Sequence, residues 1–203
     1  MVVLVTWQEQ DLAKVPPQLW AQEPYKVGLI NTAKPVTLQE GAIQPWVRQY
    51  PLSKETDEGI APTIQALIDQ ENLHMGVSPC NTPIFLVKKS KGGTQHLVED
   101  LHRLSDIMFP EFPIVPDPSV ILTSILVDTC YFSILDIQKS FFGILLHPGS
   151  QYLTTLTFRG VQLLYRRLPQ GYCESSSIFN RILGKDLATS NPADPLYSTL
   201  MTS

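Results

Sequence analysis

One carboxylate in this sequence stands where it could take part in chemistry. Asp136 follows a run of apolar and β-branched residues, 132–135, and precedes two aromatic residues, Phe141 and Phe142. The run indicates a buried strand, and a carboxylate at its end is costly unless something pairs with it. Two interpretations follow. Asp136 caps the next turn, as Asp often does, or it is a ligand for Mg²⁺, which binds few protein carboxylates and leaves room for substrate phosphates.

Short motifs on both sides of Asp136 favour the second interpretation. They are Asn81-Thr82-Pro83, Leu86-Val87-Lys88-Lys89, Val98-Glu99-Asp100-Leu101 and Leu168-Pro169-Gln170-Gly171. In this order and spacing the sequence, from about Trp7 to about Leu187, resembles the fingers and palm of a retroviral reverse transcriptase, closest to the gammaretroviral and endogenous-retroviral branch. The resemblance implies an α+β fold of the right-hand polymerase type, with fingers and an incomplete palm made of an antiparallel sheet and packed helices.

The resemblance also implies roles for single residues. Asp136 matches a catalytic carboxylate that binds Mg²⁺, and Lys89 matches a lysine that contacts the triphosphate of the incoming nucleotide. Phe141 matches the aromatic residue under the nucleotide sugar, and Gln170 an amide that touches the sugar and the neighbouring base. Taken without the family, Lys89 is equally a solvated lysine on an edge strand, and an aromatic such as Phe141 usually packs in a core. Phe142 is expected in the core.

Three departures from the family pattern predict that this chain alone has no polymerase activity. His96 replaces an arginine that clamps the phosphates with a bidentate fork, and Lys139 replaces an acid close to the metal site. The paired aspartates of the family's Tyr-x-Asp-Asp hairpin would fall at about position 210, beyond Ser203, and Asp194 stands alone. Two-metal chemistry needs several carboxylates, so we expect neither Mg²⁺ nor a deoxynucleotide to be bound productively.

Nucleic-acid binding is predicted to be weak and local. The net charge is −4, opposite to the basic surface of a free-standing nucleic-acid binder. Basic residues nevertheless cluster on two segments, with Lys88 and Lys91 on one and Arg166 and Arg167 on the other. These clusters are either contacts for the phosphates of an RNA/DNA template-primer or a solvated basic rim.

Two further functions remain open at this point. The chain is either part of an active RNA-directed DNA polymerase that is completed by missing sequence or in trans, or a protein without enzymatic activity. In the second case it is an inert remnant or pairs with an intact polymerase through an open sheet edge, which unpaired strands favour.

The composition points to an intracellular protein, in the cytoplasm or the nucleus and not secreted. The cysteines Cys80, Cys130 and Cys173 form no close pair and leave one over, so neither a disulfide framework nor a zinc site is indicated. No apolar run approaches the roughly 18 residues needed to span a membrane, and Met1–Val5 is too short for a signal peptide.

The pattern of prolines and apolar residues divides the chain into three parts. Residues 1–51 are rich in proline and predict an extended arm, with Trp20 and Trp46 as packing anchors. Residues 52–188 form the reverse-transcriptase-like domain. Residues 189–203 are rich in Ser, Thr and Pro and predict a disordered tail.

Within the domain, apolar periodicity predicts two long helices, one capped by Ser53 and kinked or restarted at Pro62, the other preceded by capping hydroxyls at Ser175–Ser177. Alternating segments predict two hairpins, with strands 84–89 and 94–98 in the first and 152–158 and 161–168 in the second. A short helix is expected over 119–126, after a proline-rich connector.

Overall fold

The structure is a computed structural model, and it describes residues 14, 16, 17, 20, 27–88, 95–109 and 137–190, without the side chains of 88, 95, 96 and 187–190. Three expectations lie outside these residues: the helix over 119–126, the strand that ends at Asp136, and most of the tail.

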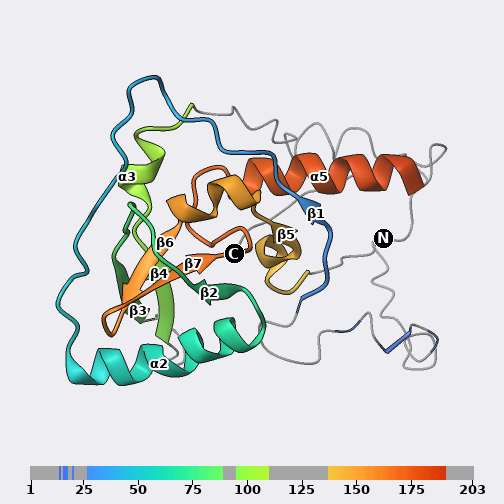
Figure 1. Cartoon of the computed structure of the whole chain (residues 1–203). Helices are drawn as coiled ribbons and strands as arrows, with labels where there is room; N and C mark the ends of the chain where they lie inside the picture. The colour runs from blue at the N-terminus through green and yellow to red at the C-terminus, as the bar shows by residue number, and fades with distance from the viewer. Residues whose placement is uncertain are drawn as a thin grey trace, which may run out of the picture.

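An antiparallel sheet of three short strands forms the centre of the described chain, in the order β2-β7-β6 (Figure 1). The strands are β2 (Leu73–Met75), β6 (Thr155–Phe158) and β7 (Val161–Tyr165). The expected hairpin β6–β7 is present and turns at Arg159 and Gly160, both with positive φ. Strand β2 was not predicted, because three residues are too few to establish an alternating pattern.

The second hairpin begins later than its sequence pattern indicated. Residues Pro148–Leu153 form a 3₁₀ helix, η3, so Tyr152 and Leu153 are not part of β6. Pro148 favours this start because its ring fixes φ at a helical value, and the His147 side chain accepts a hydrogen bond from the Gly149 amide. Tertiary contacts therefore shorten the predicted strand from its N-terminal end.

The first hairpin has the predicted boundaries to within one or two residues. Strands β3 (Ile84–Lys88) and β4 (Gln95–Glu99) are antiparallel, with Ile84 opposite Glu99 and Lys88 opposite Gln95. The hairpin lies beside the three-stranded sheet and is joined to it through Thr82, whose amide donates to the Thr155 carbonyl at 2.8 Å.

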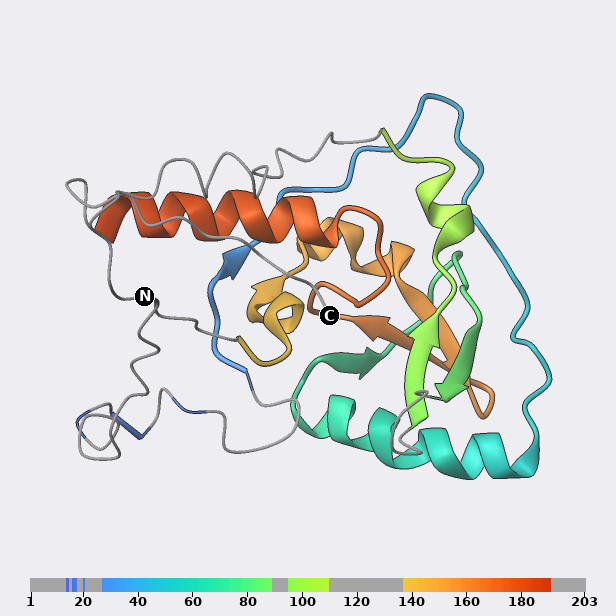
Figure 2. The same ribbon diagram turned by 180° about the vertical axis from the view of Figure 1, so that it is seen from behind.

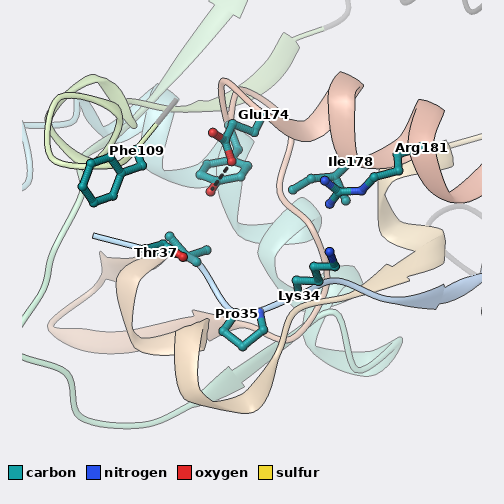
Figure 3. A pocket seen from close by; sticks show the side chains of 9 residues that line it. Lys34, Pro35, Thr37, Phe109, Glu174, Ile178 and Arg181 are labelled. Atoms are coloured by element: carbon teal, nitrogen blue, oxygen red, sulfur yellow. Dashed lines mark hydrogen bonds between the residues drawn. The ribbon is translucent and has the colours of Figure 1, made fainter. Parts of the chain in front are cut away.

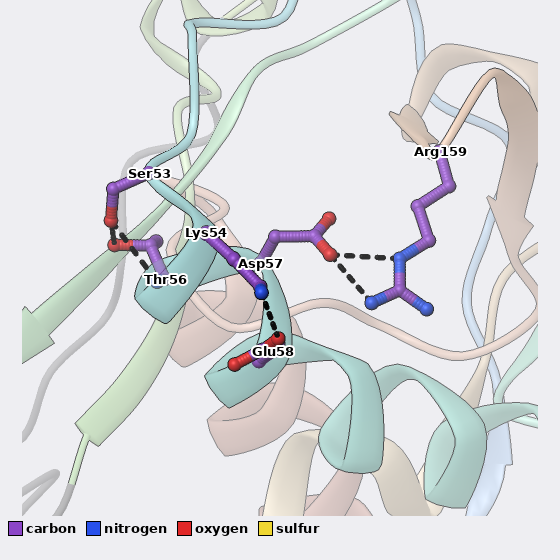
Figure 4. Close-up of polar contacts among 6 residues, drawn as sticks. All are labelled: Ser53, Lys54, Thr56, Asp57, Glu58 and Arg159. Carbon is purple, nitrogen blue, oxygen red and sulfur yellow. Dashed lines mark hydrogen bonds and ion pairs between the residues drawn. The ribbon is translucent and has the colours of Figure 1, made fainter.

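Helix α2 (Lys54–Asp69) begins where the sequence predicts. The Ser53 hydroxyl accepts a hydrogen bond from the Thr56 amide at 3.1 Å, which satisfies one of the free amides of the first turn. Asp57 in the same turn forms an ion pair of 2.5 Å with Arg159, from the turn between β6 and β7 (Figure 4). The helix is continuous through Pro62, so it does not restart there.

Helix α5 (Ser175–Ser190) includes the three serines that were expected to cap it and extends two residues beyond the boundary expected at 188. It lies on the opposite side of the three-stranded sheet from α2, as both views show (Figures 1 and 2). A short helix, α3 (His102–Ser105), follows the first hairpin. The other elements are the 3₁₀ helix η2 (Ser140–Gly143) and the two-residue strands β1 (Asn31–Thr32) and β5 (Ile144–Leu145).

The described part of the arm, residues 27–51, is extended and lies along the rim of the molecule (Figure 2). Backbone hydrogen bonds hold it in place: β1 pairs in parallel with β5, and the Val47 amide donates to the Asn81 carbonyl at 2.8 Å. The prediction that Trp20 and Trp46 anchor the arm is wrong, since their side chains are 48% and 60% exposed. Main-chain hydrogen bonds and side-chain contacts such as that of Gln39 with the Met108 carbonyl hold the arm, and a sequence pattern does not reveal them.

The core connects the two helices with the sheets. Its fully buried side chains come from every large element and include Ile60, Leu67, Leu73, Leu156 and Phe179. Within the residues that the structure describes, no helix is long and apolar enough to cross a membrane.

Candidate functional site

The turn Leu168–Gly171 is fixed by three neighbouring elements. The Leu168 amide donates to the Ile144 carbonyl at 2.9 Å, and the Ser175 hydroxyl donates to the Pro169 carbonyl at 3.0 Å. Gly171 has a φ of +92°, and a side chain there would meet the Glu99 carbonyl at 3.4 Å. Glycine suits this position because residues with a Cβ atom seldom adopt this φ. The turn thus presents Gln170, half-buried, at the end of β4.

A small cavity lies beside Gln170 and is shared by segments far apart in the sequence. Its volume is about 20 Å³, and its lining residues come from α2, β4, the start of η2, β7 and the turn: Thr63, Leu67, Leu97, Glu99, Lys139, Phe142, Tyr165 and Gln170. A cavity of this volume holds about one water molecule. The cavity is therefore too small to enclose a nucleotide.

The two aromatic residues of η2 occupy different environments. Phe142 is 4% exposed, lines the cavity and stacks on Tyr165 with ring centroids 6.3 Å apart, so its predicted core role is confirmed. Phe141 is half-buried and contacts Phe179 of α5 edge-to-face, with centroids 5.9 Å apart. Phe141 does not line the cavity beside Gln170, so a contact with a nucleotide sugar stays a prediction.

Lys139 brings a cation to the cavity in an unusual backbone conformation. Its φ and ψ are 51° and 41°, the left-handed region that non-glycine residues seldom adopt. The residue directly precedes η2 and is half-buried. The structure therefore places this lysine against the same space as Gln170.

Glu99 was not predicted as a site residue from the sequence. Its side chain is 5% exposed, lines the cavity, and forms a hydrogen bond with the Thr82 hydroxyl. Burial raises the pKa of this carboxyl to about 7, although the hydrogen bond with Thr82 acts in the opposite direction. Glu99 was visible within the Val98-Glu99-Asp100-Leu101 motif, but only the tertiary structure shows that this residue points inward and Asp100 is partly exposed.

The predicted basic pair separates into two different environments. Arg167 donates to the carbonyls of Phe142 at 2.7 Å and Gly28 at 3.2 Å, and burial lowers the pKa of its guanidinium. It therefore joins the arm to η2. Arg166 is 43% exposed and lies 3.5 Å from the Glu71 carboxylate, a surface ion pair that contributes little to stability. Of the two, Arg166 is the better placed to reach a phosphate.

Several predicted site residues lie outside the described part of the chain. These are Asp136, Lys89 and Lys91, together with the side chains of Lys88 and His96, whose backbones belong to β3 and β4. Among the described residues, no group of three or more His, Cys, Asp or Glu could hold a metal ion. The described residues that follow Asp136 are Ile137, Gln138 and Lys139, so this stretch adds a cation and no carboxylate. These residues do not form a donor set for Mg²⁺.

A larger cavity, of about 250 Å³, lies between the arm and α5 (Figure 3). Lys34 and Arg181 approach it from facing sides, and Phe109 and Ile178 supply apolar walls. The Tyr172 hydroxyl donates to the buried Glu174 carboxylate at 3.5 Å. Neither the motifs nor the resemblance predicted this cavity, because its walls come from segments that are far apart in sequence.

Comparison with known proteins places the chain beside a short segment of retroviral polyproteins. It is 35% identical to the Gag-Pol polyprotein of Walleye dermal sarcoma virus over 181 residues, and 37% identical to those of Woolly monkey sarcoma virus and Gibbon ape leukemia virus over 187. Each match covers 88% of the chain, which spans about a tenth of the length of these relatives. No family model matches the chain. The similarities support a region derived from a retroviral Gag-Pol polyprotein.

Proposed function

We propose that the chain is a reverse-transcriptase-like segment of a retroviral Pol, with fingers and part of a palm, that retains weak binding to a template-primer. The observation that carries this proposal is the meeting of Gln170, the start of η2 and the end of β4 at one cavity. The resemblance assigns nucleotide contacts to Gln170 and to Phe141, which belongs to η2. The similarity to Gag-Pol polyproteins along 88% of the chain supports the same origin.

We further propose that these 203 residues alone do not polymerise DNA. They contain no Tyr-x-Asp-Asp sequence, and His96 cannot present the planar fork with which arginine binds phosphate. Lys139 adds a positive charge beside the cavity, which opposes the binding of a second cation there. The described residues do not form a donor set that fits Mg²⁺.

The nucleic-acid contact is proposed for the hairpin β3–β4 and the end of β7. Lys88 ends β3, Lys89 and Lys91 follow it in sequence, and Arg166 follows β7 with an exposed side chain. Basic side chains on neighbouring segments can follow a phosphate backbone even where the net charge of the protein is negative. Binding of this kind is weak, electrostatic and sensitive to salt.

Fluorescence anisotropy with a labelled RNA/DNA template-primer tests this proposal. We expect the affinity of the full chain to fall steeply between about 50 and 200 mM salt, with little effect of Mg²⁺, because released counterions drive the binding. The double variant Lys88→Gln/Lys91→Gln should bind more weakly and with a shallower salt slope. Lys54→Gln/Lys185→Gln removes two exposed lysines from α2 and α5 and serves as the matched control.

Each outcome has a distinct meaning. A marked gain of affinity with Mg²⁺ would overturn the inactive assignment and favour a polymerase completed in trans. Equal losses in the two double variants would indicate binding through net charge alone and would remove the hairpin from the proposal. A folded sample that does not bind would leave an inert remnant or a protein that pairs with an intact polymerase.

A further inference from the structure

Glu99 is a buried acid with too few hydrogen-bond partners for a carboxylate. It ends β4, and its side chain is 5% exposed. One oxygen contacts the Thr82 hydroxyl, and the other, Oε2, is buried without a hydrogen-bond partner among the described residues. An ionised carboxylate in such a place loses its hydration and gains little in return.

The hydrogen bonds around Thr82 indicate where a proton lies. The Thr82 hydroxyl has one hydrogen and two acceptors nearby: the Glu99 carboxyl and the Thr155 carbonyl, the latter at 3.0 Å. An ionised Glu99 accepts this hydrogen, and the Thr155 carbonyl then keeps only its hydrogen bond from the Thr82 amide. A protonated Glu99 can instead donate to the hydroxyl oxygen, which leaves the hydroxyl hydrogen for the Thr155 carbonyl.

The resulting chain of hydrogen bonds joins two sheets. It starts on β4, passes through Thr82 ahead of β3, and ends at Thr155 on β6. The Thr82 amide donates to the same Thr155 carbonyl at 2.8 Å. On the other side, the backbone carbonyl of Glu99 packs against Gly171, next to Gln170. A change at Glu99 is therefore expected to affect the hairpin, the central sheet and the turn.

The charged and titratable groups around Glu99 are few. Among the described residues of the shared cavity they are Lys139, before η2, and Tyr165, on β7; α2 contributes Thr63 and Leu67, and the turn contributes the neutral Gln170. Asp100 follows Glu99 in the chain but bonds to His102 and Tyr50. Burial raises the pKa of Glu99 to about 7, which puts its titration in the physiological range.

We propose that a proton on Glu99 favours the hydrogen bond from the Thr82 hydroxyl to the Thr155 carbonyl, a tie between the hairpin β3–β4 and the sheet β2-β7-β6. Loss of this proton breaks the tie. The hairpin is thereby a pH-sensitive element, held firmly in weakly acidic solution and loosened in weakly alkaline solution. The inference concerns the fold of this chain and does not depend on the proposed function.

Carbon-13 NMR of glutamate carboxyl groups in the full chain tests the protonation directly. We expect one carboxyl to titrate near neutral pH, and this signal to be absent from Glu99→Gln, whose amide keeps the shape and can donate to Thr82. Glu58→Gln removes an exposed carboxylate, 64% exposed, and should leave the neutral titration in place. If every glutamate of the wild-type protein titrates below about pH 5.5, as ordinary glutamates do, the proposal is overturned.

Hydrogen exchange of the β3–β4 amides tests the tie. After correction for intrinsic exchange, we expect the opening of the hairpin to increase about tenfold between pH 6 and pH 8, given an ordinary carboxyl pKa in the open state. Glu99→Gln should show no such increase, and α5 amides should not follow the hairpin in either protein. An equal increase in wild type and Glu99→Gln would show that Glu99 does not control the hairpin.

Discussion

Two adjacent arginines illustrate, at the scale of single residues, how position overrides residue type. Arg166 and Arg167 look alike in the sequence, and both were predicted to contact phosphates. In the structure Arg166 remains largely accessible, while Arg167 turns inward and donates to two backbone carbonyls. Side chains alternate across a strand and its extension, so neighbours face opposite sides. One arginine is available for a ligand, and the other holds the arm.

Replacing these arginines should separate the two roles. Arg167→Met removes two charge-assisted hydrogen bonds and leaves the carbonyls of Gly28 and Phe142 without their donor, so we expect a loss of about 1–3 kcal/mol in the free energy of unfolding. Arg166→Met, the matched control, should change it by less than about 0.5 kcal/mol, since its ion pair is exposed. Urea denaturation measures both, and equal effects would contradict the assignment of Arg167 as a tie.

At the scale of elements, helix α2 shows which local signals in the sequence are sufficient to predict where a helix begins. A serine before an acidic first turn and an apolar stripe predicted its start, and the structure places Ser53 as the cap. Pro62 was expected to kink or restart the helix, and α2 does not restart there, because burial of Ile60, Ile64 and Leu67 on both sides of the proline favours one continuous helix. Packing here outweighs the local cost of proline.

The cap of α2 gives a prediction for this element. Ser53→Ala removes the acceptor of the Thr56 amide and should lower the free energy of unfolding by about 1 kcal/mol, the usual cost of losing such a cap. Ser53→Asp keeps an acceptor and adds a favourable charge at the helix N-terminus, so it should restore most of the stability. Thermal denaturation of both variants measures these changes in stability. A Ser53→Asp protein as unstable as Ser53→Ala would mean that the serine acts through some other contact.

The response of the fold to pH belongs to the scale of the whole molecule. The pKa of Glu99 is raised in the folded protein to about 7, whereas an unfolded glutamate titrates at its ordinary, lower value. Between these two pKa values the folded state therefore binds more protons than the unfolded state. The contribution of Glu99 to stability is greatest below its pKa in the unfolded state and is lost as pH rises through its pKa in the folded state. His74 acts in the opposite sense, because burial and Arg166 lower its pKa and disfavour its charged form.

We expect the free energy of unfolding of the wild-type protein to fall by about 2–3 kcal/mol from pH 5 to pH 8 through Glu99, which follows from the separation of its two pKa values. The Glu99→Gln variant should lack this loss and be the more stable protein at pH 8. Urea titrations at several pH values measure both curves. Parallel curves would show that the carboxyl is ionised throughout the range or does not affect folding.

Several features of the protein could be predicted from its sequence alone. These include the starts of α2 and α5, both hairpins, the extended arm and the buried position of Phe142, because caps, alternation and apolar periodicity are local signals. The order of the motifs also indicated a retroviral origin. The similarities to Gag-Pol polyproteins support a region derived from a retroviral Pol. The Asp136 strand and the polymerase fold as a whole stay predictions.

Other features were decided only by the tertiary structure. Strand β2 is defined by its partner β7, η3 replaces the start of a predicted strand, and the arm is held by main-chain hydrogen bonds instead of tryptophans. The same is true of Glu99, which is one acid among many in the sequence. Burial sets the protonation of an ionisable group, and it depends on which segments pack around that group, so a linear pattern cannot reveal it.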